Sequence, residues 1–310
     1  MLRALILYLS RAAWAYHAIN NWGLARRAAR RFVAGETQAE AVAVVSGLNA
    51  QGMTATIDVL GESLTDREEA RSAAQAYLAL IDAIRQNGLK AWISLKLTGL
   101  GIDIDPVLCR QNMRQILGAA RTAGGICVTI DMEDSAYTQT TLDMFRALRH
   151  EDGFDNLRTV IQAYLYRSDE DIQVLAAEGA GIRLCKGAYK EPPSIAYPRK
   201  RDVDKAFVRQ MKVLLDAASE GRGYPGIATH DEAIIEQAKA YASERDIPRD
   251  RFEFQMLYGV RSALQKQFAA EGYRVRIYVP FGTRWYPYFM RRLAERPANL
   301  WFFISNLLRR

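Results

Sequence analysis

Two adjacent arginines, Arg291 and Arg292, are well suited to binding a small anion. They lie in the segment Tyr288-Phe-Met-Arg-Arg-Leu-Ala-Glu295. In an α-helix, residues three and four apart share a face, so one side would carry Tyr288, both arginines and Glu295. Two guanidinium groups can hold both oxygens of a carboxylate, and Glu295 can pair with Arg291 and fix its orientation. The segment predicts a carboxylate-binding helix, although an isolated Arg-Arg pair is more often part of a solvated basic surface.

Polar residues also stand where short apolar segments of the chain end. They are Lys96, Asp131, Glu133, Gln162, Tyr164, Arg183, Lys186, Tyr189, Thr229, His230, Asp231, Glu253, Gln255 and Tyr278. If these segments are parallel strands of a barrel, their carboxyl ends meet at the mouth where active sites of such barrels lie. Lys96 and Asp131 could equally be an ion pair buried in the barrel scaffold as part of a functional site. His230 could be a structural histidine with Asp231 as its partner. Polar residues at nearly every segment end favour a site.

The elements that would position these residues alternate along the chain. Eight short apolar or β-branched segments are the expected strands: Thr54–Leu60, Ala91–Leu97, Ile126–Met132, Thr159–Leu165, Gly181–Lys186, Gly226–His230, Phe252–Leu257 and Val275–Val279. Their nearly continuous apolar character is typical of parallel strands covered by helices. Between them lie segments with the periodicity of amphipathic helices, among them Thr65–Gln86, Pro106–Thr122, Thr138–Leu148 and Asp202–Ala218. The pattern predicts an α/β fold, a (βα)8 barrel.

The barrel is expected to form one domain over residues 1–310, with residues 1–50 as a helical arm and the arginine helix over the barrel mouth. A doubly wound dinucleotide-binding fold would place a glycine-rich loop after its first strand. The segment Gly221-Arg-Gly-Tyr-Pro-Gly226 matches that loop formally, but it precedes an expected strand. Pro225 would also fall at the start of the helix that must hold the phosphates. We therefore reject this motif.

Composition limits the classes of function. The chain has 310 residues, 49% of them hydrophobic, and a net charge of +7 that fits nucleic acid, an anionic membrane surface or an acidic substrate. It lacks the basic and aromatic interleaving of single-strand binders, which argues against nucleic acid. Three cysteines without a CxxC pair indicate neither a disulfide framework nor a zinc site, so a reducing cytoplasm is expected. The apolar start, residues 1–9, is too short to span a bilayer.

A metal centre is not favoured. Two of the three histidines, His17 and His150, fall in expected helices away from the strand ends. The segment Asp131-Met-Glu-Asp134 could bind magnesium, but no phosphate loop accompanies it. We therefore expect no metal.

Seven motifs, in order between Asp58 and Asn299, resemble those of the proline dehydrogenase family, in its single-function bacterial form. They are Ser94-Leu-Lys-Leu-Thr-Gly-Leu-Gly101, Ile130-Asp-Met-Glu133, Gln162-Ala-Tyr-Leu165, Arg183-Leu-Cys-Lys-Gly-Ala-Tyr-Lys-Glu-Pro192, Ala228-Thr-His230, Phe252-Glu-Phe-Gln-Met-Leu-Tyr-Gly259 and Tyr288-Phe-Met-Arg-Arg-Leu-Ala-Glu295. The resemblance implies a distorted (βα)8 barrel that binds FAD. It also implies oxidation of L-proline to Δ1-pyrroline-5-carboxylate, with hydride passing from proline C5 to flavin N5 and electrons then to a membrane quinone.

The resemblance assigns substrate-binding roles to particular residues. Lys96, Arg291 and Arg292 would hold the proline carboxylate, with Glu295 supporting the arginines. Asp131 would lie beside the substrate, either as a base for the amine proton or to orient Lys96. The pocket walls would be Tyr189, Leu257, Tyr278 and Tyr288. A related imino acid such as 4-hydroxyproline is the alternative substrate, which the bulk of Tyr278 disfavours.

The flavin would be held by residues from several strand ends. By resemblance, Arg183 would lie near flavin N5 and Gln162 at the polar edge of the ring. Lys186, Gly187 and Ala188 would approach the pyrophosphate. Thr229 and His230 would contact the nucleotide.

Basic clusters flank apolar and aromatic segments at both ends of the chain, at residues 26–31 and 309–310. This composition is suited to shallow docking on an anionic membrane, although both segments could simply pack on the barrel. The expected location is the cytoplasm, with peripheral contact at the inner face of the membrane as one alternative.

Overall fold

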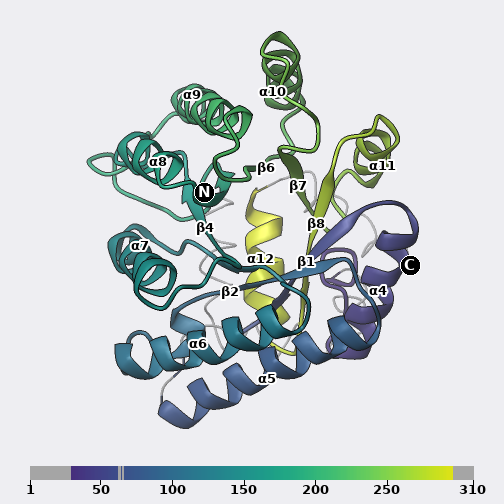
Figure 1. The fold of residues 1–310 in the computed structure, drawn as a ribbon, viewed down its shortest axis with the longest axis vertical. Coiled ribbons are helices and arrows are strands. Elements are labelled where there is room, and N and C mark those ends of the chain that lie inside the picture. Colours follow the sequence, from purple (N-terminus) through teal and green to yellow (C-terminus); the bar gives the residue numbers. More distant parts are fainter. Residues whose placement is uncertain (1–28, 62–63, 65, 296–310) are drawn as a thin grey trace.

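The computed structural model describes residues 29–61, 64 and 66–295. Its centre is a closed barrel of eight parallel strands in chain order, with β1 paired to both β2 and β8 (Figure 1). The strands are β1 (Thr54–Val59), β2 (Ala91–Leu95), β3 (Val128–Ile130), β4 (Leu157–Gln162), β5 (Gly181–Cys185), β6 (Gly226–Ala228), β7 (Glu253–Leu257) and β8 (Val275–Phe281). The predicted α/β barrel is therefore confirmed.

Helices surround the barrel, and one main helix connects each strand to the next. They are α5 (Arg67–Gln86), α6 (Pro106–Thr122), α7 (Thr138–Arg146), α8 (Ser168–Ala177), α9 (Lys200–Ser219), α10 (Glu232–Glu244) and α11 (Ser262–Ala270). Two short 3-10 turns, η1 (Thr98–Leu100) and η2 (Ser135–Tyr137), and a π-helical turn, η3 (Ala147–Glu151), join them. Aspartates begin the two longest early helices: Asp66 accepts from the first backbone amides of α5, and Asp105 does so for α6.

The expected arm contributes a structural helix, α4 (Gln38–Ala50), which begins with a capping box between Thr37 and Glu40. Its apolar residues Ala41, Val45 and Leu48 are buried in the same core as the strands, and the helix contacts both β1 and β8. In a regular barrel, the helix after β8 covers this seam. Here the seam is covered by α4, a helix that precedes β1 in the sequence. Residues 1–28 of the expected arm lie outside the described residues.

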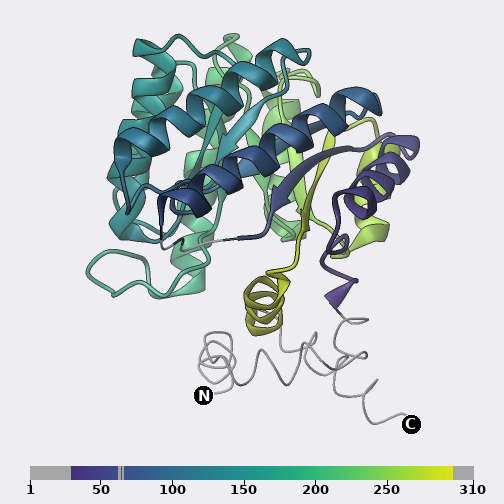
Figure 2. The ribbon, with the colours of Figure 1, turned by 90° about the horizontal axis from the view of Figure 1, so that it is seen from below.

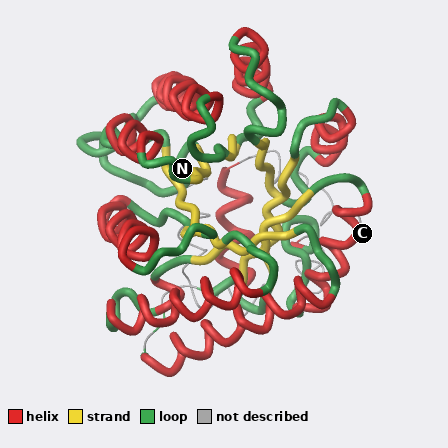
Figure 3. Tube along the Cα trace, in the orientation of Figure 1, coloured by secondary structure: helices red, strands yellow, loops and turns green. Residues whose placement is uncertain are grey.

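The helix that follows β8, α12 (Trp285–Glu295), takes a different position. It lies beyond the ends of the strands, as Figure 2 shows, and crosses the ring of strands when the barrel is viewed end-on (Figure 3). Trp285, Tyr286 and Phe289 pack with Phe32 and Val33 in a second apolar cluster. Burial of these aromatic side chains holds α12 over the carboxyl mouth of the barrel.

The observed strands differ from the predicted ones by up to three residues at their ends, and the differences in β4 and β8 have a clear cause. We expected the fourth strand over Thr159–Leu165, but it ends at Gln162 because the following backbone turns to pair Leu165 with Ala196. The eighth strand continues past the predicted end at Val279 to Phe281, although Pro280 lacks an amide hydrogen. The carbonyl of Pro280 accepts a hydrogen bond from Ala34 instead. Among the described residues, no helix is long and apolar enough to cross a membrane.

The seam position of α4 generates a test. Val45 is fully buried, and Ala43 is exposed on the same helix. We expect Val45→Asp to lower the free energy of unfolding by at least about 3 kcal/mol, because an unpaired charge would enter the core. Ala43→Asp is the matched control and should lower it by less than about 1 kcal/mol. Urea unfolding followed by circular dichroism measures both, and equal effects would show that α4 does not seal the barrel.

Candidate active site

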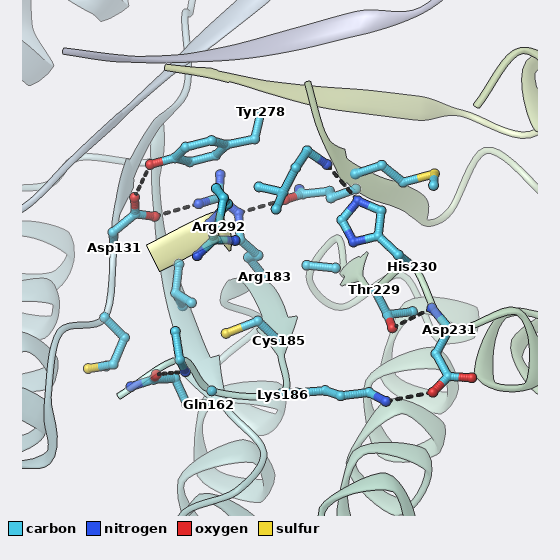
Figure 4. Close-up of a pocket in the computed structure, with 18 of the residues that line it drawn as sticks. Asp131, Gln162, Arg183, Cys185, Lys186, Thr229, His230, Asp231, Tyr278 and Arg292 are labelled. Atoms are coloured by element: carbon cyan, nitrogen blue, oxygen red, sulfur yellow. Dashed lines mark hydrogen bonds and ion pairs between the residues drawn. The ribbon is translucent and has the colours of Figure 1, made fainter. Parts of the chain in front are cut away.

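A cavity of about 850 Å³ opens at the carboxyl end of the strands, beneath α12. It contains most of the residues predicted from the strand ends and the last helix: Lys96, Asp131, Gln162, Arg183, Lys186, Gly187, Ala188, Tyr189, Thr229, His230, Leu257, Tyr278, Tyr288 and Arg292. The side chains of Arg291 and Glu295, also predicted, lie outside the described residues. Figure 4 shows labelled residues of this cavity pointing toward one another from separate strands.

Arg183, on β5, is a buried cation of the cavity with several polar contacts. Its Nε donates to Gln255 Oε1 at 2.6 Å, and its Nη1 donates to Ser94 Oγ at 3.1 Å and forms an ion pair with Asp131. The guanidinium also lies 5.2 Å from the centre of the Tyr278 ring. These contacts come from four other strands or strand ends and fix the plane of a buried guanidinium.

Tyr278 lies between two carboxylates. Its hydroxyl is 2.7 Å from Asp58 Oδ2 and 2.8 Å from Asp131 Oδ2. A hydroxyl has one hydrogen, so it donates to only one carboxylate at a time. Burial, followed by the charges of Asp131 and Asp58, raises the pKa of Tyr278 well above its usual value. The phenol is therefore neutral and positions both carboxylates.

Asp58 is a site residue that sequence reasoning missed. It is 1% exposed, and its Oδ2 also lies 3.3 Å from Lys96 Nζ, so Asp58 forms an ion pair with Lys96. Asp131, which we expected either to act as a base or to orient Lys96, contacts Ser94, Arg183 and Tyr278. The available signal was a charged residue inside the otherwise apolar segment 54–60.

Gln162 connects β4 to the two neighbouring loops. Its Nε2 donates to the carbonyl of Glu133 at 2.7 Å, and its Oε1 accepts from the amide of Ala188 at 3.3 Å. Between Lys186 and Ala188, Gly187 has a φ of +111°, and a Cβ there would lie 2.3 Å from the ring of Tyr164. Packing against Tyr164 therefore requires glycine at this position, independently of any ligand.

Lys186 lies in a network of four charges at the rim. Its Nζ is 2.5 Å from Asp204 Oδ1 and 2.8 Å from Asp231 Oδ2, and Lys200 contacts the same two aspartates. The hydrogen bond from Lys186, and then the charge of Lys186, lower the pKa of Asp231 to about 2. The two positive and two negative charges balance, so Lys186 meets an incoming anion with its charge already neutralised.

His230 connects two strand ends. Its Nε2 accepts a hydrogen bond from the backbone amide of Leu257 at 2.9 Å, which places the ring hydrogen on Nδ1 of the neutral imidazole. Asp231, considered as its partner, instead pairs with Lys186 and Lys200. Within the described residues, no group of three or more histidines, cysteines or carboxylates could hold a metal ion.

The residues of the cavity form two chemical environments. Lys96, Arg183 and Arg292 supply positive charge beneath α12, and Arg292 lies 5.2 Å from the ring centre of Tyr288 on the same helix. Asp131 supplies the negative charge beside Tyr278. A small zwitterion could place its carboxylate toward the cations and its ammonium toward the carboxylate.

Comparison with known proteins identifies the family. The family model described as Proline dehydrogenase matches residues 41–304. Proline dehydrogenase 1 of Bacillus subtilis (strain 168) is 44% identical over 310 residues, which cover 100% of both chains. Proline dehydrogenase of Deinococcus radiodurans is 42% identical over 291 residues, covering 93% of this chain and 91% of that protein.

Solved structures agree on the fold. The crystal structure of proline utilization A (PutA) from Bdellovibrio bacteriovorus, inactivated by N-propargylglycine, matches with a TM-score of 0.81 and 28% identity. The match covers 87% of this chain and 33% of that one, so this chain corresponds to about a third of the PutA protein. With a family model over most of its length and relatives similar over nearly their full lengths, the chain belongs to the proline dehydrogenase family.

Proposed function

We propose that the protein oxidises L-proline to Δ1-pyrroline-5-carboxylate, with FAD as its cofactor and a membrane quinone as the electron acceptor. The observation that carries this proposal is the convergence of Lys96, Asp131, Arg183 and Arg292 in one cavity of a chain from the proline dehydrogenase family.

Lys96, Arg291 and Arg292 would bind the proline carboxylate through charge-assisted hydrogen bonds. Asp58 holds Lys96 from the barrel interior, because the two side chains form an ion pair and are 11% and 1% exposed. Fixing the carboxylate orients the imino acid ring, and orientation is a large part of what a protein contributes when a cofactor carries the redox chemistry.

The walls of the cavity favour an unsubstituted ring. Tyr189, Leu257, Tyr278 and Tyr288 line it, and the hydroxyl of Tyr278 is engaged with Asp58 and Asp131. A ring hydroxyl of 4-hydroxyproline would meet the bulk of Tyr278 without gaining that hydroxyl as a partner. Proline is therefore preferred, by about 1–3 kcal/mol for one pocket wall.

The amine must be neutral before it can lose hydride, since its lone pair drives that loss. Asp131, which lines the cavity, would either receive this proton or orient Lys96; its Oδ2 lies 2.8 Å from the hydroxyl of Tyr278. Arg183 and Ser94 hold its other oxygen, so the carboxylate keeps its direction as charge changes beside it.

The residues present fit FAD. The cavity of about 850 Å³ is within the range of cofactor sites. Arg183, Gln162, Thr229, His230 and the loop Lys186–Ala188 supply donors along one side. FAD supplies the hydride acceptor when bound, and the fixed Arg183 guanidinium would favour the anionic reduced ring. Lys186 already contacts Asp204 and Asp231 and would have its third N–H for the pyrophosphate, while Lys200 also holds both aspartates.

We expect the purified protein, incubated with excess FAD and then desalted, to show flavin absorbance bands. Arg183→Met should weaken FAD retention or shift the flavin bands, because it removes the cation of the cavity interior. Arg114→Met is the matched control, since Arg114 is 59% exposed on α6. A wild-type protein without flavin bands after this treatment would contradict the cofactor assignment.

We expect Arg292→Lys to raise KM for L-proline at least about tenfold, because lysine keeps the charge but loses the planar two-pronged contact with a carboxylate. Arg291→Lys should act in the same direction. Flavin retention should be unchanged in both variants. Arg284→Lys, an exposed arginine one residue before α12, is the control. Steady-state kinetics with a dye acceptor measure these values, and a KM within about twofold of wild type for both variants would reject the carboxylate role.

The quinone acceptor implies that the protein meets a membrane surface. The two basic clusters, residues 26–31 and 309–310, lie largely outside the described residues; Arg30 is described and is 71% exposed. We propose peripheral docking on the inner face of the cell membrane, from the cytoplasm, through these clusters.

Vesicle sedimentation at low salt tests the docking proposal. We expect more protein to sediment with anionic than with neutral vesicles, and Arg30→Gln with Arg31→Gln to reduce the difference. The paired control is Arg85→Gln with Arg114→Gln, exposed arginines on α5 and α6. Equal binding to both kinds of vesicle would reject docking, even if the enzyme reduced a quinone in detergent.

A further inference from the structure

A second cavity, of about 620 Å³, lies at the opposite end of the barrel. It is lined by residues at the amino ends of the strands, among them Trp92 of β2, Arg158 of β4, Glu253 of β7 and Arg276 of β8. Because all strands are parallel, this is the mouth farthest from the candidate active site. The catalytic proposal gives it no role.

The interior side of this cavity contains more positive than negative charge. Arg158 and Arg276 are each 5% exposed, and Glu253 is 1% exposed. Glu253 Oε1 accepts from Arg276 Nε at 2.7 Å, so these two charges form a buried ion pair. Arg158 forms no ion pair with any residue that the structure describes. One buried guanidinium is therefore left without a counter-charge in contact.

Only some of the hydrogen-bond donors of Arg158 have an acceptor. Its Nη2 donates to the carbonyl of Tyr224 at 2.6 Å, and its guanidinium lies 4.7 Å from the ring centre of Trp92 and 5.2 Å from that of Tyr224. Its Nε is buried without an acceptor. Burial is the main cause that lowers the pKa of Arg158 to about 10. An uncompensated buried charge is costly, and an anion in contact would offset that cost.

Further arginines reach the same cavity from its rim. Arg274 is 54% exposed, and Arg149 donates to the carbonyls of Glu178 and Gly179. Four arginines but only two carboxylates, Asp155 and Glu253, line the cavity. Even with Asp250, which lies 3.8 Å from Arg274 at the rim, the arginines outnumber the carboxylates, and such an excess draws a small anion inward.

We propose that this amino-terminal cavity is a binding site for a small oxyanion of the phosphate type. Arg158, which lines the cavity, holds it from inside through its guanidinium, and Arg274 contacts it from the rim. Two guanidinium groups already lie against the ring of Trp92, with Arg276 3.3 Å and Arg158 4.7 Å from its centre, which disfavours stacking of an aromatic ligand there. The occupant is therefore recognised through its charge and oxygen atoms. The proposal is independent of proline oxidation.

Isothermal titration of the purified protein with inorganic phosphate, at constant ionic strength set with chloride, tests the proposal. We expect saturable phosphate binding by the wild type. Arg158→Met should abolish it, and Arg274→Gln should weaken it at least about tenfold. Since Arg274 is exposed at the rim, its replacement leaves the core intact and keeps the test valid if Arg158→Met does not fold.

Two controls locate the bound phosphate. Arg114→Gln removes an exposed arginine of α6, and Arg292→Gln removes one from the opposite mouth. Both should bind phosphate as the wild type does. The proposal is overturned if the wild type binds no phosphate, if Arg274→Gln binds it with wild-type affinity, or if Arg292→Gln is the variant that loses binding.

Discussion

A chain of charged and polar side chains through the barrel interior connects its two mouths. Arg276 contacts Glu253, Glu253 accepts from Gln255, and Gln255 accepts from Arg183. Arg183 then pairs with Asp131, and Tyr278 joins Asp131 to Asp58 and Lys96. In a desolvated interior each group is stable only while its neighbour is present. The active-site charges are therefore held from within the barrel as well as by the loops around its mouth.

The exchange of positions between α4 and α12 lets the barrel place a helix over its own mouth. The helix after the last strand of a regular barrel is needed on the outside, to cover the seam between the first and last strands. Here α4 covers that seam with Ala41, Val45 and Leu48. This leaves α12 available to bring Tyr288 and Arg292 to the cavity. The substrate-binding arginine of the proposed function thus depends on a helix far away in the sequence.

The alternation of apolar and helical segments was sufficient to predict the barrel, because parallel strands covered on both faces need continuous apolar runs. The same logic located most cavity residues, since the carboxyl ends of all strands in such a barrel meet at one mouth. The pattern could not predict which charged side chains form ion pairs with one another. Asp58, inside an expected strand, is the partner of Lys96, and Lys186 is neutralised by Asp204 and Asp231. Such contacts join positions that only the closed barrel brings together.

The position of α4 also determines when folding can finish. Among the described elements this helix and β1 are synthesised first, but β8, which pairs with β1 and packs against α4, follows the remaining six strands. Until β8 is made, the free edge of β1 and part of the apolar side of α4 have no partner, and such surfaces are prone to associate with other chains. Closure joins segments far apart in the chain, which makes it an inherently slow step. The last strand thus completes the barrel and covers the remaining apolar side of α4.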